Sequence, residues 1–125
     1  MIDFKNGSFV KLKKTNAEPL TKEVAPLLIG GEQVLSAYQS IRDYVIFTNK
    51  RIISVNVQGL TGKKKDYTSL PYSKVVAFSV ETSGVFDLDS ELELHFSGLG
   101  LVKFEFTGAS DIVSIGKSIG EYILK

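Results

Sequence analysis

The chain of 125 residues contains no cysteine and no tryptophan, and its single histidine is His95. Without cysteine the protein can form no disulfide, no thiolate metal site and no cysteine nucleophile. One histidine also excludes a multi-histidine metal site within a single protomer. We therefore expect a fold held by its hydrophobic core, and we predict no cofactor and no metal.

Long apolar runs and a strong charge bias are also missing. No stretch approaches the roughly 18 apolar residues of a membrane span, and the beginning, MIDFKNGSFVKLKK, lacks the apolar run of a signal peptide. Fifteen Lys and Arg residues stand against 14 Asp and Glu residues, giving a net charge of +1. Such a charge gives no overall attraction to nucleic acid or acidic lipid. We expect a cytoplasmic protein with no nucleic-acid partner and weak or absent membrane contact.

Length and composition favour one globular domain. A hydrophobic fraction of 43% and a charged fraction of 23% are ordinary for such a domain, and the chain is long enough to bury a core. We expect one domain over residues 1–125, with an N-terminal arm and helix over 1–31, a β-barrel over 32–108 and a capping helix over 110–124.

The N-terminal residues predict an arm and then a helix. The lysine-rich first fourteen residues indicate a short helix or an irregular arm. Apolar residues then recur at helical spacing, at Leu20, Val24, Leu27 and Leu28. Asn16 is suited to cap this helix, Pro26 to bend its last turn, and the glycine pair at 30–31 to end it.

From residue 33 the pattern changes to short strands. Apolar and polar residues alternate in ELELHF and LVKFEF, which is typical of half-buried strands, and the intervening SGLG suits a hairpin. The other strand segments are QVLSAYQSI, YVIFT, KRIISVNVQ, KKKDYTSL and KVVAFSVET. Seven short antiparallel strands predict a partly open barrel or a sandwich.

The C-terminal segment predicts an amphipathic helix that could close one end of the barrel. Its apolar stripe consists of Ile112, Ile115, Ile119, Tyr122 and Ile123. Ser110 is a suitable cap, and Asp111 lies where the helix dipole favours an anion. Gly116 and Gly120 reduce helix propensity, which indicates close approach to another backbone.

The order of seven strands and one capping helix is the pleckstrin-homology layout. Four blocks are more specific: LLIGGEQVLSAY, RDYVIFTNKRII, VNVQGLTGKKKDYTSLPYSKVVAFSVETSG and DLDSELELHF. From about Leu28 to the C-terminus the chain resembles the bacterial pleckstrin-homology family, once a domain of unknown function. The resemblance implies a mainly β fold with flanking helices: a seven-stranded antiparallel, partly open barrel capped by a C-terminal helix. It further implies no enzymatic activity, self-assembly into a closed ring that is pentameric for single-domain members, and a polar surface that binds another, unidentified protein.

The segment QGLTGKKK has some features of a phosphate-binding loop. A P-loop requires two glycines five positions apart, then Lys and Ser or Thr, and it must open a helix. Here Gly59 and Gly62 are three apart, Lys63 precedes another lysine, and a strand pattern follows. The GxxG loop of KH domains must join two helices, which this one does not. We interpret Gly59 and Gly62 as turn residues with positive φ.

Two groups of opposite charge form the candidate interaction surface. Residues 50–65 contain five basic side chains and no acidic one, namely Lys50, Arg51, Lys63, Lys64 and Lys65. Residues 81–93 contain five acidic side chains and no basic one, namely Glu81, Asp87, Asp89, Glu91 and Glu93. Complementary patches on different faces suit a head-to-tail interface between protomers. The alternative is that both groups are ordinary solvated turns.

Other functions have weaker support. The phosphoinositide motif of eukaryotic pleckstrin-homology domains needs a long basic loop, whereas SIRDYV is short and pairs Arg42 with Asp43. A monomeric anion or lipid-headgroup binding module using the basic turn at residues 50–65 remains the second hypothesis. His95 beside Glu93 is common on solvated sheets, no serine lies in a nucleophile elbow, and DLDSELE lacks the glycine of a calcium loop. We predict no enzyme.

Overall fold

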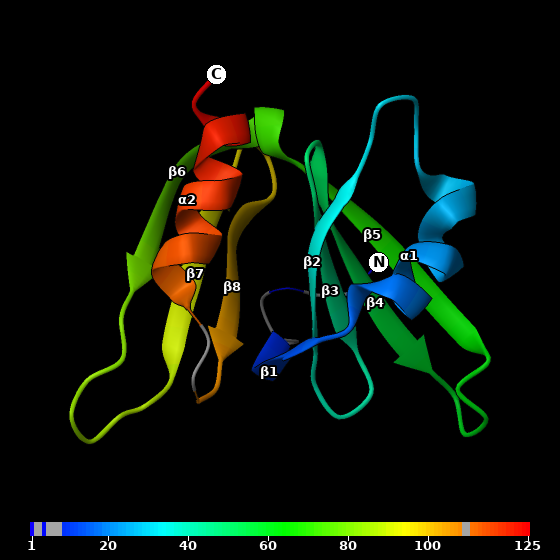
Figure 1. Ribbon diagram of the computed structural model, residues 1–125, viewed down its shortest axis with the longest axis horizontal. Helices are drawn as coiled ribbons and strands as arrows, with labels where there is room; N and C mark the ends of the chain where they lie inside the picture. The colour runs from blue at the N-terminus through cyan, green and yellow to red at the C-terminus, as the bar shows by residue number, and fades with distance from the viewer. Residues whose placement is uncertain (2–3, 5–8, 109–110) are drawn as a thin grey trace.

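Within the residues that the structure describes, eight strands form one open sheet in the order β5-β4-β3-β2-β1-β8-β7-β6 (Figure 1). The computed structural model describes residues 1, 4, 9–108 and 111–125. The strands are β1 (Phe9–Thr15), β2 (Val34–Gln39), β3 (Tyr44–Thr48), β4 (Arg51–Gln58), β5 (Lys64–Pro71), β6 (Val75–Glu81), β7 (Ser90–Phe96) and β8 (Gly100–Phe106). The helices are α1 (Ala17–Val24) and α2 (Ile112–Ile123), with 3₁₀ turns η1 (Ala25–Leu27) and η2 (Tyr72–Lys74).

The sheet is mainly antiparallel and does not close. Each strand pairs antiparallel with its neighbours except β1 and β8, which run parallel. Strands β5 and β6 form the two edges, and η2 connects them. A mainly β fold with an open sheet and a C-terminal helix is therefore confirmed, with eight strands in place of the predicted seven.

The additional strand, β1, lies where we expected an irregular arm or short helix, and that expectation was wrong. Phe9 and Leu12 are both buried, and they pair with Phe104 and Phe106 of β8. The register shifts between Phe9 and Leu12, and Lys11 between them adopts a φ of 55°. This irregularity puts two inward residues three positions apart, which removes the alternation by which a strand is recognised. The sheet therefore begins at Phe9 and not near residue 32.

Helix α1 covers the outer face of the β2–β5 half of the sheet. The Asn16 side chain accepts a hydrogen bond from the Glu18 amide at 3.1 Å, as the predicted cap requires. The helix ends at Val24, before the glycine pair, and Pro26 lies in the 3₁₀ turn that follows. A 3₁₀ turn has three residues per turn, and Leu27 leaves the predicted apolar face and is 43% exposed.

The hydrophobic core consists of two clusters on opposite faces of β3 and β4. The larger cluster fills the space between the two halves of the sheet and α2, and it includes Val45, Phe47 and Ile52. The smaller cluster lies under α1 and includes Ile46 and Ile53. Because both faces are covered, all five residues of β3 are buried.

Helix α2 packs against β6, β7 and η2. Asp111 is its N-cap, since its Oδ1 accepts a hydrogen bond from the Ser114 amide at 3.0 Å; the predicted cap Ser110 lies outside the described residues. A Cβ on Gly116 would lie 2.6 Å from Val80 Cγ2, and one on Gly120 would lie 3.6 Å from Phe78 Cζ. The glycines thus approach side chains of β6 and not, as we expected, another backbone.

Candidate interaction surfaces

The segment FTNKR, part of one of the four family blocks, forms a turn that is hydrogen-bonded to residues 31–33 before β2. Thr48 Oγ1 donates a hydrogen bond to Glu32 Oε2 at 2.7 Å and accepts bonds from the amides of Lys50 and Arg51. The Asn49 side chain donates to the Gly31 carbonyl and accepts from the Gln33 amide. These hydrogen bonds hold the residues at the start of β2 next to the residues at the start of β4. The FTNKR segment therefore has a structural role.

Arg51 belongs to this turn and to a buried ion pair. Its Nε and Nη2 atoms each lie 2.9 Å from a different oxygen of Glu32, and Nη2 also donates to the Leu27 carbonyl. The Glu32 side chain is fully buried and that of Arg51 is 19% exposed. Burial raises the pKa of Glu32, but hydrogen bonds from Arg51, Thr48 and the Ile29 amide outweigh it and lower the pKa overall. Arg51 therefore stabilises the fold and presents little free charge.

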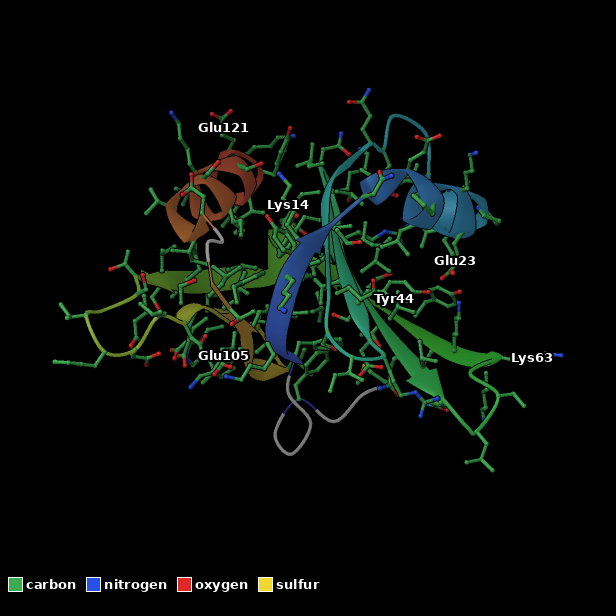
Figure 2. The ribbon with its side chains drawn as sticks, turned by 60° about the horizontal axis from the view of Figure 1, so that its bottom comes forward. Lys14, Glu23, Tyr44, Lys63, Glu105 and Glu121 are labelled. Atoms are coloured by element: carbon green, nitrogen blue, oxygen red, sulfur yellow. The ribbon has the colours of Figure 1, made fainter. Side chains whose placement is uncertain are left out.

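The five basic side chains do not form one patch. Arg51 pairs with Pro71 and Gln58 with Lys64, so Lys50 and Lys64 lie at opposite ends of β4. Eight strand residues span about 23 Å. Lys63 and Lys64 are exposed at the β4–β5 hairpin, where Lys63 points away from the molecule (Figure 2).

Lys65 turns back from the hairpin toward α1. Its Nζ lies 2.8 Å from Glu23 Oε1 and 5.6 Å from the centre of the Tyr44 ring. Glu23 also accepts hydrogen bonds from the hydroxyls of Tyr44 and Tyr67. Burial raises the pKa of Glu23, but the bonds from Lys65 and the two tyrosines reverse the shift and lower it. Burial and the nearby Glu23 raise the pKa of Tyr44. Lys65 is thus neutralised within the protomer.

The loop of the β4–β5 hairpin spans five residues, 59–63. Gly59 and Gly62 have φ angles of 77° and 68°, a region that glycine enters without steric cost. The Arg42 guanidinium donates a hydrogen bond to the Gly59 carbonyl, linking this hairpin to the β2–β3 hairpin. Strands flank the turn on both sides, so it lacks the helix N-terminus that a P-loop uses for phosphate.

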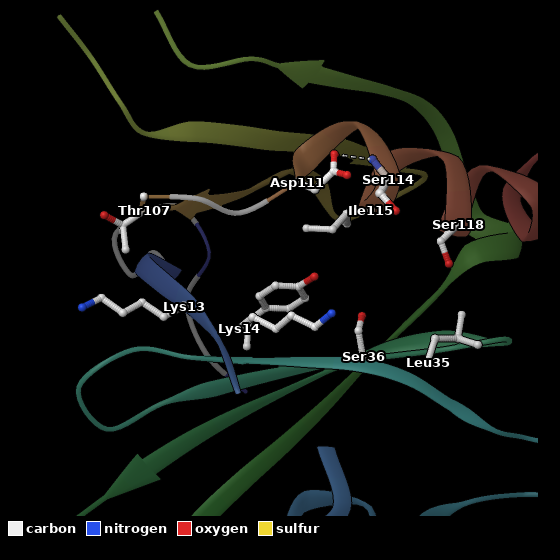
Figure 3. Close-up of a pocket in the computed structure, with 11 residues that line it drawn as sticks. Lys13, Lys14, Leu35, Ser36, Thr107, Asp111, Ser114, Ile115 and Ser118 are labelled. Carbon is white, nitrogen blue, oxygen red and sulfur yellow. Dashed lines mark hydrogen bonds between the residues drawn. The ribbon is translucent and has the colours of Figure 1, made fainter. Parts of the chain in front are cut away.

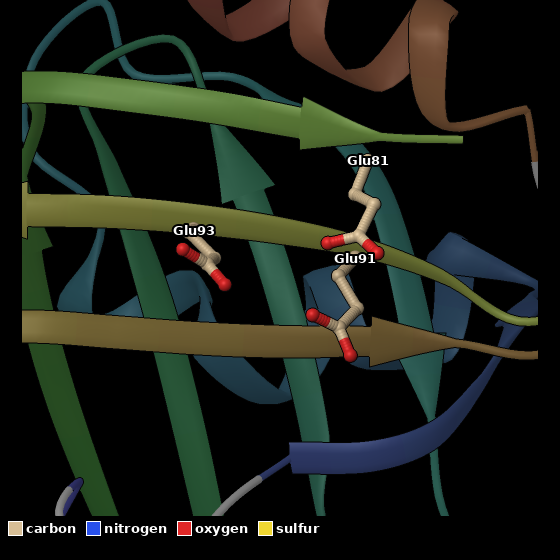
Figure 4. A group of neighbouring side chains, drawn as sticks. All are labelled: Glu81, Glu91 and Glu93. Atoms are coloured by element: carbon tan, nitrogen blue, oxygen red, sulfur yellow. The ribbon is translucent and has the colours of Figure 1, made fainter. Parts of the chain in front are cut away.

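The acidic side chains gather on the other half of the sheet. Glu81 at the end of β6 and Glu91 and Glu93 on β7 bring carboxylate oxygens within 4.8 Å of one another (Figure 4). Asp89 lies 3.2 Å from Lys11 Nζ, whereas Asp87 accepts a hydrogen bond from the Asp89 amide within the β6–β7 loop. The structure therefore brings three of the five acids together, whereas Asp87 stays within its loop and Asp89 pairs with Lys11 of β1.

Sequence reasoning missed Lys103, which partly neutralises this cluster. Its Nζ lies 3.5 Å from Glu91 Oε2 and 3.6 Å from Glu93 Oε1, and these two carboxylates raise the pKa of Lys103. The alternation of LVKFEF had already put Lys103 on the outer face, and Glu93 is its cross-strand partner. Pairing the two outward patterns would have found it. Three carboxylates offer oxygen ligands of the kind that Ca²⁺ and Mg²⁺ prefer. The Lys103 ammonium beside two of them competes with a cation, so we interpret the cluster as a surface of mixed charge.

Strands β5 and β6 are the two edges of the sheet. On β6, Val76 is 72% exposed and Ala77 and Ser79 are also exposed. Because η2 connects the end of β5 to the start of β6, Lys64 and Glu81 lie at the strand ends farthest from η2. His95 lies exposed on β7 between Ala77 and Leu101, which are neutral cross-strand neighbours.

The open sheet, the C-terminal helix and the charged outer surfaces define a pleckstrin-homology-like domain. The chain matches the family model described as the bacterial PH domain over residues 3–123, and it belongs to that family. The family is generally non-catalytic. The resemblance inferred from the sequence blocks is thereby confirmed.

Similar proteins support the assignment. The uncharacterised protein YjqA of Bacillus subtilis is 40% identical over 116 residues, which cover 91% of this chain and 93% of YjqA. YozO of the same organism is 36% identical over 88 residues, covering 70% and 73%. Among solved structures, a DUF1696 family protein with a pleckstrin-homology domain from Shewanella loihica has a TM-score of 0.80 at 40% identity, covering 91% of this chain and 98% of that one. A pleckstrin-homology domain from Shewanella amazonensis has a TM-score of 0.69 at 40% identity, covering 96% and 94%.

Among the helices of the described residues, none has the length and apolar character to cross a membrane.

Proposed function

We propose that the protein is a non-catalytic, cytoplasmic scaffold that assembles with itself into a ring, which the family resemblance implies to be pentameric, and that this ring presents a polar surface to a protein partner. The observation that carries the proposal concerns the edge strands β5 and β6: among the described residues neither has a second neighbouring strand, and Lys64 and Glu81 put opposite charges at their corresponding ends. An unpaired edge exposes a row of backbone donors and acceptors, which must be paired, covered or charged. Pairing β5 of one protomer with β6 of the next satisfies both edges.

Strand direction supports a cyclic arrangement of this kind. β5 runs toward η2 and β6 runs away from it, so a rotation axis roughly along the strands would set neighbouring edges antiparallel. In that arrangement Lys64 of one protomer and Glu81 of the next would lie at the same end of the interface. A heterologous contact closes into a ring when its rotation closes, and otherwise forms a filament. Exposed ion pairs contribute about 0 to 1 kcal/mol each, so the backbone pairing would supply most of the affinity and the charges would set the register.

The outer face of β7 and β8 is the surface we assign to the partner. Glu91, Glu93 and Glu105 project from it, and Lys103 is the basic residue among them. A net negative face suits a partner with a basic surface. The interface between protomers, at β5 and β6, would leave this face accessible.

The experiment is the native mass by light scattering on a sizing column, at low and high salt. We expect a species several times the 13.7 kDa protomer. The double variant Lys63→Glu/Lys64→Glu should shift the mass toward the monomer, and adding Glu81→Lys should restore assembly. These two lysines are chosen because Lys65 is bound to Glu23.

The control is Lys22→Glu/Lys117→Glu, which makes the same change in net charge on exposed positions of the two helices. It should assemble like the unmodified protein. A clean monomer at both salt concentrations would overturn the ring proposal. Assembly that survives the Lys63 and Lys64 changes would remove the charge argument and leave the strand pairing to be tested.

A second candidate function is a monomeric module that binds anionic lipid headgroups. It is favoured by Leu60, which is fully exposed in the same hairpin as Lys63 and Lys64. An exposed apolar side chain followed closely by two lysines suits the surface of an anionic membrane. Sedimentation with vesicles containing phosphatidylserine, compared with neutral vesicles, tests it. Pelleting of a monomer that falls with salt would favour this function over the scaffold.

A further inference from the structure

A half-open cleft of about 730 Å³ lies between α2 and the β1–β2 pair (Figure 3). Its size falls in the range of about 300 to 1,000 Å³ that is usual for small-molecule sites. Its walls come mainly from β1, β2 and α2, with Thr107 and Gly108 after β8 at one end, and none of its residues belongs to the edge strands β5 and β6. The cleft is therefore a feature apart from the proposed assembly.

Lys14 gives the cleft a positive charge. Its side chain extends into the cleft toward Ser36, whereas the adjacent Lys13, which also borders the cleft, carries its ammonium in the opposite direction (Figure 3). Within the described part of the chain, Lys14 has no ion-pair or hydrogen-bond partner, unlike Lys11 and Lys65. An ammonium that has no internal partner is free to bind an anion.

Tyr38 adds a fixed hydroxyl donor to the same wall. The residue is 5% exposed, and its ring makes edge contacts with Phe47 and Phe106, at centroid distances of 5.7 and 5.0 Å. These contacts hold the ring in one orientation. Burial raises the pKa of Tyr38, the neighbouring Ser36 hydroxyl opposes this shift and the Asp111 carboxylate adds to it; the net shift is upward, so the Tyr38 hydroxyl stays protonated.

The remaining wall limits the charge and shape of a ligand. Leu35 and Ile115 supply apolar surface, and Ser118 offers a further hydroxyl. Asp111, which caps α2 through the Ser114 amide, also lines the cleft. Its negative charge disfavours a doubly charged phosphate, whereas a single negative group can bind Lys14 with the apolar part of the ligand over Leu35 and Ile115.

We propose that this cleft binds a small monocarboxylate, with its carboxylate held by Lys14, Tyr38 and Ser36 and its apolar body against Leu35 and Ile115. The cleft joins one unpaired cation, a buried hydroxyl donor and an apolar wall, which together distinguish this ligand class from neutral alcohols and from phosphate.

The test follows the methyl signal of Ile115 by NMR in methyl-labelled protein, a method that tolerates a large assembly. Hexanoate is the probe, hexanamide is the neutral isostere, and inorganic phosphate is the second anion. We expect a saturable shift with hexanoate and affinity at least about tenfold weaker for hexanamide, because a hydrogen bond to a charged group contributes more than a neutral one. Phosphate should leave the signal unchanged.

Two variants and one control locate the site. Lys14→Gln should weaken hexanoate binding at least about tenfold, and Tyr38→Phe should weaken it while keeping the aromatic contacts. Lys13→Gln removes the neighbouring charge that points outward, and it should bind like the unmodified protein. The proposal is overturned by equal binding of hexanoate and hexanamide, by unchanged affinity in Lys14→Gln, by equal losses in Lys13→Gln and Lys14→Gln, or by the absence of saturation.

Discussion

At the scale of single residues, neighbours decide what a charge does. Arg51 and Lys65 belong to the same basic segment as Lys63 and Lys64, but each has a carboxylate partner inside the protomer. A buried ion pair contributes little net stability compared with an apolar pair, whereas removing one partner leaves the other charge buried without compensation and lowers stability. Substitutions of these two side chains should therefore lower the stability of the fold and leave assembly unchanged.

We predict that Glu32→Gln lowers the free energy of unfolding by about 3 kcal/mol, because the Arg51 guanidinium loses its partner in a largely buried site. Urea unfolding followed by circular dichroism measures the change. The control Lys50→Gln alters an exposed charge in the same turn and should change stability by less than about 0.5 kcal/mol. Equal losses in the two variants would contradict the structural role of the ion pair.

A pH prediction follows from Glu23. Its pKa is lower in the folded protein than its ordinary value of 4.5, so its contribution to stability is fully present above pH 4.5 and is lost as the pH falls through the folded value. We expect Glu23→Gln to flatten the decrease in stability below pH 4.5. Urea titrations over a pH series measure it, with Glu18→Gln on the exposed face of α1 as the control. An unchanged acid slope would show that the Lys65–Glu23 contact does not stabilise the fold.

At the scale of elements, packing sets limits that the local pattern does not reveal. The glycines of α2 reduce helix propensity equally in sequence terms, yet their surroundings differ. A Cβ at 116 would overlap with the stiff side chain of Val80, whereas a Cβ at 120 would make an ordinary contact with Phe78.

We therefore predict opposite effects for the two alanine substitutions. Gly116→Ala should destabilise the protein by about 1 to 2 kcal/mol, because overpacking outweighs the gain in helix propensity. Gly120→Ala should be neutral or stabilising by up to about 1 kcal/mol. Thermal unfolding of the two variants gives the order directly. The reverse order would mean that the Val80 side chain moves to accommodate the new methyl group and that the Phe78 side chain does not.

At the scale of the whole molecule, stability should depend on assembly, because the proposed interface pairs the sheet edge of one protomer with that of the next. Anything that binds the folded state raises its apparent stability by mass action. We expect the melting temperature to rise with protein concentration, and we expect that dependence to disappear in Lys63→Glu/Lys64→Glu. Calorimetry over a hundredfold range of about 1 to 100 μM measures it. A melting temperature independent of concentration would count against coupled folding and assembly.

Much of the fold could be predicted, and less of the candidate surfaces. The alternation of β7 and β8 and the stripe of α2 predicted their buried residues, because one covered face imposes a strict period. β1 was missed because the irregularity at Lys11 breaks the period. For the surfaces, spacing along the chain grouped Lys50 with Lys64, whereas the length of β4 separates them.

The sequence by itself determined the family, seven of the eight strands and the glycine turns, since turns, caps and alternating faces depend on residues close together in the chain. The tertiary structure decided which charges remain free. Glu32 and Arg51 are 19 residues apart, and Glu23 and Lys65 are 42 apart. Which partners meet over such distances depends on how the sheet brings the strands together. The same holds for the cleft at Lys14, because its walls come from β1, β2 and α2, and their approach exists only in the folded chain.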